Sequence, residues 1–146
     1  MISGQIVEEM KGCLFSAPPP MALGHCVSAD AAMGGSVFRR FHQHCRGLQD
    51  IVKDMSSVGS CIVINDQGRP IYNLVVKEKF YDRATLADLR KCLQEARNHM
   101  IQNHVTQLAL PRLGQGHDCL LWTDVYTILE DVFRYTRIKV IVFTLL

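Results

Sequence analysis

Short apolar runs alternate along this chain with segments of helical periodicity, and this alternation restricts the fold more than any other feature. Apolar, β-branched runs bounded by turn residues are typical of buried strands, whereas apolar residues three and four positions apart are typical of one helix face. Strands are predicted at 22–28, 60–65, 71–76, 105–110 and 139–145. Because strands and helices that alternate in sequence build a sheet covered by helices, the chain predicts a layered α/β domain.

Helical spacing occurs in four segments: from about residue 36, at 48–55, from Thr85 and from about Thr123. Asp88 stands three positions after Thr85, which gives the third helix a start that resembles a capping box. Residues 66–70 join two predicted strands in a hairpin, so the sheet must be mixed. We expect one α/β domain over residues 1–146, with a mixed β-sheet sandwiched between helices. Near the N-terminus, 18–20 (PPP) predicts a stiff, extended connector.

The composition favours one globular domain inside the cell. No run approaches the roughly 18 consecutive apolar residues of a membrane span, and Glu8 and Glu9 interrupt the first apolar stretch, unlike a secretory signal. The 16 Lys and Arg are nearly balanced by 14 Asp and Glu, so charge gives no strong reason to expect nucleic acid as the main partner. We therefore expect a nuclear or cytoplasmic protein that makes no membrane contact and is a monomer.

The six cysteines and six histidines predict no metal site. No CxxC pair occurs, and scattered cysteines in a reducing compartment are free thiols. His42, His44 and Cys45 lie close together, but their spacing matches no closed tetrahedral site. We expect neither a metal ion nor another cofactor.

Two places share one pattern, in which a buried strand leads through glycines into a helix. The first runs from Ser28 to Gly34 and Gly35, and the second from Leu110 to 114–116 (GQG). Converging backbone N–H groups and helix N-termini favour bound anions, so two such loops predict a diphosphate site. The alternative is that the glycines serve only chain geometry. Neither loop is a P-loop or a Rossmann fingerprint.

Asp118 and Lys77 are the candidate reactive side chains. A carboxylate beside the second loop could orient water or a hydroxyl, although it could also only serve the dipole of the next helix. Lys77 ends a buried strand, where an amine among apolar neighbours can become a nucleophile; the alternative is a lysine that reaches out to water. Lys79 competes for the same role. We expect His25 and Trp122 to be packing residues.

Beyond these patterns, several stretches together resemble a macrodomain: 11–15 (KGCLF), 24–28 (GHCVS), 33–35 (MGG), 110–118 (LPRLGQGHD), Trp122 and the tail 143–145 (FTL). The resemblance runs nearly from end to end. Within the family, these stretches resemble more specifically the glycohydrolases that remove terminal ADP-ribose from proteins and deacetylate O-acetyl-ADP-ribose.

This resemblance implies a cleft for ADP-ribose across one edge of the sheet, in which Lys77 attacks the distal ribose and Asp118 helps to resolve the adduct. It assigns ADP-ribose binding to Cys13, Leu14, Ser28, Gly34, Gly35, Arg112, Leu113, Gly114, Gln115, Gly116, His117, Asp118 and Leu145. The implied substrates are ADP-ribose esters on glutamate or aspartate of proteins; ADP-ribosylated nucleic acid is left open. The resemblance further suggests roles in the DNA damage response and purine nucleoside metabolism. The alternatives are a reader that binds ADP-ribose without cleaving it and a member that has lost nucleotide binding.

One position departs from the family pattern. Many macrodomains carry Asp after the Lys-Gly pair, where it accepts a hydrogen bond from the adenine amino group, and this chain has Cys13. A thiol is a weak acceptor, and loss of a hydrogen bond to a carboxylate costs about 1.5–3 kcal/mol. Adenine binding is therefore expected to be weaker here, or to use a backbone group or water.

Overall fold

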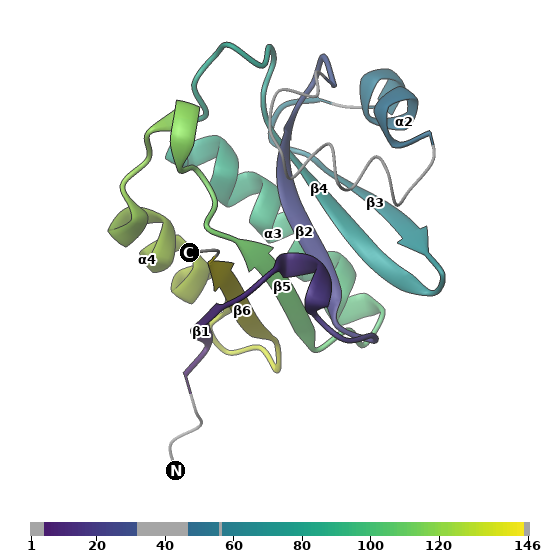
Figure 1. Cartoon of the computed structure of the whole chain (residues 1–146), viewed down its shortest axis with the longest axis vertical. Coiled ribbons are helices and arrows are strands. Elements are labelled where there is room, and N and C mark those ends of the chain that lie inside the picture. Colours follow the sequence, from purple (N-terminus) through teal and green to yellow (C-terminus); the bar gives the residue numbers. More distant parts are fainter. Residues whose placement is uncertain (1–4, 32–46, 56, 145–146) are drawn as a thin grey trace.

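The computed structural model describes residues 5–31, 47–55 and 57–144. Its strands form a six-stranded sheet in the order β1-β6-β5-β2-β4-β3, and Figure 1 shows them side by side with α3 behind them. The strands are β1 (Val7–Lys11), β2 (Ala22–Ser28), β3 (Cys61–Asp66), β4 (Arg69–Lys77), β5 (Gln107–Pro111) and β6 (Lys139–Thr144). Only β3 runs antiparallel to its neighbour in this sheet. The predicted mixed α/β sheet is confirmed.

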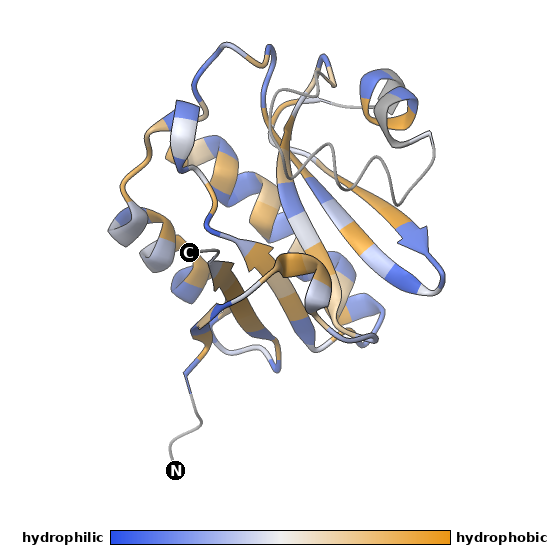
Figure 2. Cartoon of the chain, viewed as in Figure 1, coloured by the Kyte–Doolittle hydropathy of each residue, from blue (hydrophilic) through white to orange (hydrophobic). Residues whose placement is uncertain are grey.

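Helices cover both faces of the sheet. On one face α3 (Leu86–Gln102) and α4 (Trp122–Phe133) pack against the strands. On the other face lie the 3-10 turn η1 (Leu14–Ser16) and α2 (Leu48–Met55). The central strands therefore face apolar neighbours on both sides, and Figure 2 shows β5 and β6 as mostly hydrophobic.

The strand β6 shows how the sequence encodes these two layers. Its residues Val140 and Val142 belong to the core beneath α3 and α4, whereas Ile141 belongs to the opposite core. Because successive side chains of a strand point to opposite faces, a strand covered on both sides must be apolar throughout. The prediction of a doubly covered C-terminal strand is confirmed.

The start of α3 follows its predicted signal. Thr85 has extended backbone angles, and its Oγ1 accepts a hydrogen bond from the Asp88 N–H at 3.2 Å. Asp88 in turn accepts from the Thr85 hydroxyl through Oδ2 at 3.0 Å. The two side chains are therefore hydrogen-bonded to each other, and the Thr85 side chain also accepts from a free N–H at the start of the helix, as an N-cap residue does.

The predicted hairpin between β3 and β4 is confirmed with a tighter turn than expected. Pairing continues to Asp66 and Arg69, so only Gln67 and Gly68 form the turn, with φ of 54° and 84°. Two consecutive residues at positive φ match the right-handed twist of the paired strands. Pro70 therefore lies within β4 rather than in the loop.

The structure differs from the expectations at the N-terminal strand and at 18–20. The strand β1 was not predicted, because only Val7 of its five residues is buried. Residues Pro18–Pro20 form a turn closed by a hydrogen bond from the Met21 N–H to the Pro18 carbonyl at 3.0 Å, with a cis bond between Pro19 and Pro20, so the extended connector is wrong. The helix predicted from residue 36 lies outside the described residues. Within the part described, no helix is long and apolar enough to span a membrane.

Candidate active site

The carboxyl ends of five strands meet at one edge of the sheet. Since β1, β6, β5, β2 and β4 run parallel to one another, the segments that follow them leave from the same edge, where ligands bind in open α/β sheets. Predicted site residues lie at four of these ends: Cys13 after β1, Ser28 in β2, Lys77 in β4 and Arg112 after β5. The topology thus brings the predicted site together from distant parts of the chain.

Lys77 and Asp118 form an ion pair at this edge. The Lys77 Nζ lies 2.8 Å from the Asp118 Oδ1, and the two side chains are only 13% and 11% exposed. A lysine that merely ends a strand would extend its amine into water, whereas this amine is held at the protein surface by a carboxylate. Lys79 lies beyond the end of β4 and is exposed, so Lys77 is the lysine placed beside the aspartate.

A second hydrogen bond fixes the Asp118 carboxylate. The N–H of Ala84 donates to the same Oδ1 at 3.0 Å. Asp118 ends the 3-10 turn η2 (Gly116–Asp118), and the N-cap of α4 is Leu121, which makes no side-chain capping bond. The carboxylate is therefore engaged with the lysine and the backbone of another loop, and it does not cap α4.

The segment that follows β4 is tied to both neighbouring loops. The Phe80 N–H donates to Oδ2 of Asp30 at 3.3 Å, and the Tyr81 carbonyl accepts from the His117 ring at 2.7 Å. One loop end comes from β2 and the other from β5. These bonds connect the three loops around the Lys77–Asp118 pair into one hydrogen-bonded unit.

The glycine-rich loop after β5 has one packed side and one open side. Gly114 and Gly116 both have φ of +77°. A Cβ on Gly114 would lie 2.6 Å from the Leu120 Cδ1, whereas nothing lies within 4 Å of a Cβ on Gly116. The Gly114 carbonyl also accepts from the Leu120 N–H at 2.8 Å. At Gly116 the backbone of this loop is open, so an anion could approach its main-chain groups. The diphosphate site stays a prediction.

Arg112, at the start of this loop, is anchored within the protein. Its Nη2 lies 3.0 Å from the Glu9 Oε1, and its guanidinium stands 4.9 Å from the centre of the Trp122 ring. Trp122 also meets Tyr126 edge to face. The arginine therefore ties the loop to β1 and α4, and Trp122 is the packing residue that we expected.

The other predicted binding residues differ in what they can offer a ligand. Ser28 is buried, and its hydroxyl donates to Oδ1 of Asp30 at 2.5 Å. The side chains of Leu14 and Leu113 belong to the core, so only their main-chain atoms could face ADP-ribose. Cys13 directly precedes η1 and is partly exposed. The residues Gly34, Gly35 and Leu145 lie outside the described part of the chain.

The partly buried thiol of Cys26 does not compete with Lys77 as a nucleophile. Burial raises its pKa, the charges of Cys92 and Asp118 add to this effect, and the charge of Lys77 opposes it. Because the reactive form of cysteine is the thiolate, Cys26 is a neutral, inert side chain at physiological pH.

His25 is a packing residue, as expected. It is 1% exposed, and its Nε2 lies 2.5 Å from the Asn73 Oδ1. Burial lowers its pKa to about 4, although the hydrogen bond to Asn73 partly opposes this effect. The imidazole is therefore neutral at pH 7.

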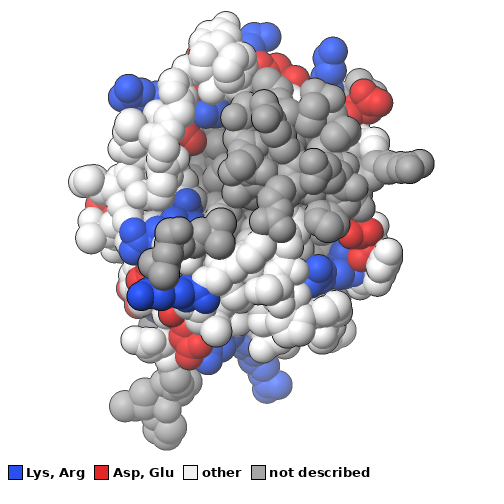
Figure 3. Space-filling model, in the orientation of Figure 1, with Lys and Arg blue, Asp and Glu red and all other residues white. Residues whose placement is uncertain are grey.

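The histidines and carboxylates of the described residues form no cluster of three or more that could hold a metal ion. The candidate trio His42, His44 and Cys45 lies outside the described ranges. On the face shown in Figure 3, Lys and Arg side chains are interspersed with Asp and Glu among the residues described.

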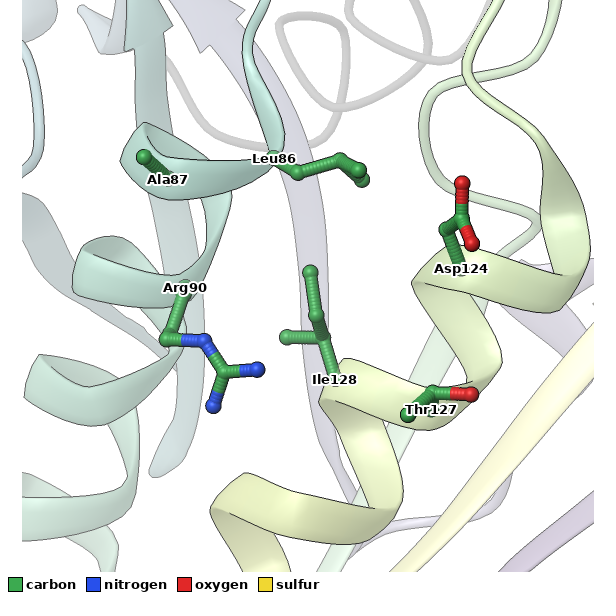
Figure 4. Close-up of a pocket in the computed structure, with 6 residues that line it drawn as sticks. All are labelled: Leu86, Ala87, Arg90, Asp124, Thr127 and Ile128. Atoms are coloured by element: carbon green, nitrogen blue, oxygen red, sulfur yellow. The ribbon is translucent and has the colours of Figure 1, made fainter.

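A separate groove of about 330 Å³ lies between α3 and α4. Figure 4 shows Leu86 and Ile128 pointing from the two helices into the space between them, with Arg90 on one helix and Asp124 on the other. None of its lining residues belongs to the predicted site, so the groove is distinct from the Lys77–Asp118 pair.

No family model matches the sequence. Individual relatives do match: the ADP-ribose glycohydrolase OARD1 of Bos taurus is 36% identical over 97% of this chain and 93% of its own length. The human protein of the same name is 35% identical over the same shares. The chain belongs to the macrodomain family. Within that family it is a homologue of the ADP-ribose glycohydrolase OARD1.

Solved macrodomain structures confirm the fold. The macrodomain of Mycobacterium tuberculosis DarG superposes with a TM-score of 0.85 at 19% identity, and the match covers 96% of this chain and 98% of that one. DarTG of Thermosipho africanus, solved in complex with ADP-ribose, gives 0.80 at 16% identity over 97% of this chain and 42% of its own. The expected macrodomain architecture is therefore confirmed.

Three site contacts were not predicted from the sequence. Ala84 acts through its backbone N–H, which every residue but proline carries, so no sequence signal marks it. Asp30 follows Ser28 by two positions, and that Ser-x-Asp spacing could have indicated its hydrogen bond. Glu9 is 103 residues from its partner Arg112, and the two are brought together by the pairing of both β1 and β5 with β6.

Proposed function

We propose that this macrodomain is an ADP-ribosyl hydrolase that releases mono-ADP-ribose from esters on glutamate and aspartate side chains and also deacylates O-acetyl-ADP-ribose. The observation that carries the proposal is the 2.8 Å contact between the Lys77 Nζ and the Asp118 Oδ1 at the carboxyl edge of the sheet. A nucleophile within hydrogen-bond reach of a base is the arrangement that covalent catalysis requires. A protein that only binds ADP-ribose needs no such pair.

The pair supports a two-step reaction. Asp118 accepts a proton from the Lys77 ammonium, and the free amine attacks the anomeric carbon of the distal ribose. The bond between that carbon and the ester oxygen breaks, and the carboxylate leaves with both electrons. Asp118 passes its proton to the departing carboxylate and becomes a free carboxylate again. It then deprotonates a water molecule, which attacks the same carbon, and the carbon–nitrogen bond breaks with its electron pair returning to the Lys77 nitrogen. Asp118 finally returns a proton to this amine. The products are ADP-ribose and the free carboxylic acid.

The rest of the edge supports the binding of ADP-ribose itself. The open backbone at Gly116 can offer N–H groups to the diphosphate, and we assign the distal ribose to the space beside Ser28 at the carboxyl end of β2. Cys13 takes the place of an adenine-binding carboxylate, so we propose that adenine is held through main-chain atoms or water. The residues Gly34, Gly35 and Leu145 complete this assignment, which spans residues 1–146 as one domain.

The proposed partners are ADP-ribosylated proteins in the nucleus or cytoplasm, and the protein acts as a monomer. A role in the DNA damage response belongs to the same proposal.

The test uses a peptide ADP-ribosylated on glutamate, incubated with the wild type, Lys77→Ala and Lys79→Ala. Lys79→Ala is the matched control, because that lysine is exposed and lies two residues beyond the strand end. We expect mass spectrometry to find free ADP-ribose with the wild type and the control but none with Lys77→Ala, while calorimetry finds ADP-ribose binding in all three. Unchanged release by Lys77→Ala would reject the mechanism. Tight binding without release by the wild type would identify a reader.

A further inference from the structure

An exposed aromatic pair, Phe80 and Tyr81, begins three residues after the candidate nucleophile Lys77. The rings of Phe80 and Tyr81 meet edge to face with their centres 5.5 Å apart, although the residues are 50% and 63% exposed. Single exposed apolar residues are ordinary, but two aromatic rings in contact beside a candidate active site indicate a binding surface. The other large apolar residues exposed in the described part are Met10, Ile101, Leu121 and Tyr135.

The protein holds this aromatic pair in a fixed place. Its backbone is tied through the Phe80 N–H to Asp30 and through the Tyr81 carbonyl to His117. The two residues that flank the pair are also bonded to each other, because the Lys79 N–H donates to Oδ2 of Asp82 at 3.1 Å. The strand β4 anchors one end of the segment, and the bond from Ala84 to Asp118 anchors the other. A rigid aromatic surface loses little entropy when a partner binds, so it contributes efficiently to affinity.

We propose that Phe80 and Tyr81 are the docking surface for the polypeptide part of the substrate, the residues that flank the ADP-ribosylated carboxylate. This inference rests on the proposed function. The ester cleaved at Lys77 joins the ribose to a side chain, so the polypeptide backbone passes within the length of one glutamate side chain from the Lys77–Asp118 pair. The two rings lie on the segment of residues 77–84. Lys77 at its start and the N–H of Ala84 at its end both bind the Asp118 carboxylate.

Charge favours a polypeptide over a nucleic acid as the occupant. Lys77 is paired with Asp118. Beyond it the segment carries Lys79 and Arg83 but also Glu78 and Asp82, so the formal charge of residues 78–84 is balanced. A surface that stacks nucleic-acid bases combines aromatic rings with an excess of basic side chains that neutralise phosphates. Aromatic residues without that excess are typical of protein-binding surfaces.

The test compares two leaving groups at the same reactive centre. One substrate is a peptide ADP-ribosylated on a central glutamate, and the other is O-acetyl-ADP-ribose, which has no polypeptide. The variants are Phe80→Ala and Tyr81→Ala, with Tyr81→Phe as the conservative change. Tyr135→Ala is the matched control, because Tyr135 is a 97% exposed aromatic residue beyond the opposite end of α4. Thermal unfolding checks that each variant folds, and an ADP-ribosylated oligonucleotide is the third substrate.

We expect Phe80→Ala and Tyr81→Ala to raise KM for the peptide about tenfold with little change in kcat, and to leave both constants for O-acetyl-ADP-ribose unchanged. Tyr81→Phe and Tyr135→Ala should behave as the wild type. Equal losses on both substrates, unchanged peptide kinetics or a loss confined to the oligonucleotide would each overturn the inference while the hydrolase remains. A wild type inactive on both the peptide and O-acetyl-ADP-ribose would overturn the proposed function, and the inference with it.

Discussion

Lys77 stands opposite Ser28 across the β2–β4 pair, in a place where unbroken register would have put Val76. Val27 pairs with Val75, so two residues of β4 then face one residue of β2. A bulge of this kind changes the direction in which the next side chain leaves the sheet, and bulges are common beside active sites. Here it lies at the residue whose amine meets the aspartate, so the irregular register is part of how the site is built.

Replacement of Asp118 by Asn should separate the two chemical steps. The amide keeps the size of the side chain but cannot accept a proton, so we expect turnover to fall by about 10² to 10⁴. Solvent can replace Asp118 as the acceptor of the Lys77 proton, because the lysine is partly exposed, whereas the adduct is left without a base that activates water. We therefore expect an ADP-ribose adduct to accumulate on Lys77. Intact-mass measurement of the protein after mixing with substrate detects it. Asp124→Asn, an exposed carboxylate on α4, is the control. An Asp118→Asn protein with full turnover would show that the carboxylate takes no part.

The two glycines of the loop after β5 should respond differently to the same substitution. Gly114→Ala adds a Cβ at 2.6 Å from Leu120, whereas Gly116→Ala adds one in open space at the same φ of +77°. Left-handed backbone costs about 1–2 kcal/mol for alanine, and overpacking adds about 1–3 kcal/mol. We expect urea unfolding to show the larger loss of stability for Gly114→Ala. Equal losses would mean that the loop moves to accept the methyl group.

The buried His25 should make the protein less stable in mild acid. Its pKa is about 4 in the folded chain and close to the usual value of about 6.5 in the unfolded chain. Between these values the unfolded state binds more protons, so the free energy of unfolding falls as pH falls through that window. The loss reaches about 3 kcal/mol near pH 4. In urea unfolding at several pH values, His25→Gln should show a smaller dependence; an unchanged slope would contradict this account.

The cysteines should differ sharply in their reactivity in the folded protein. Cys119 is exposed and Cys92 is buried, and burial raises the pKa of Cys92 to about 12 and raises that of Cys61 as well. Since alkylating agents need an accessible thiolate, iodoacetamide at neutral pH should label Cys119 well before Cys92 or Cys61. Peptide mapping at timed intervals measures the order. Early labelling of Cys92 would indicate that α3 opens from the sheet.

Strong periodic signals predicted the helices and inner strands, because there a single pattern determines burial. The edge strand β1 escaped prediction, since its stability comes from backbone pairing with β6 and requires one buried side chain, Val7. Lys77 and Asp118 were predicted from the sequence as candidate reactive side chains, but the contact between them depends on the order of strands that are distant in sequence. The bond from Ala84 involves only main chain on its donor side, and no side-chain pattern can indicate it.

The two outer strands of the sheet differ in how they resist intermolecular pairing. An edge strand offers unpaired main-chain groups to other chains, and charged side chains discourage that contact. The strand β1 carries Glu8, Glu9 and Lys11, whereas β3, at the other edge, has an uncharged apolar centre at 62–64. Aggregation of partly unfolded molecules should therefore begin along β3, and a lysine at the exposed Asn65 would protect that edge.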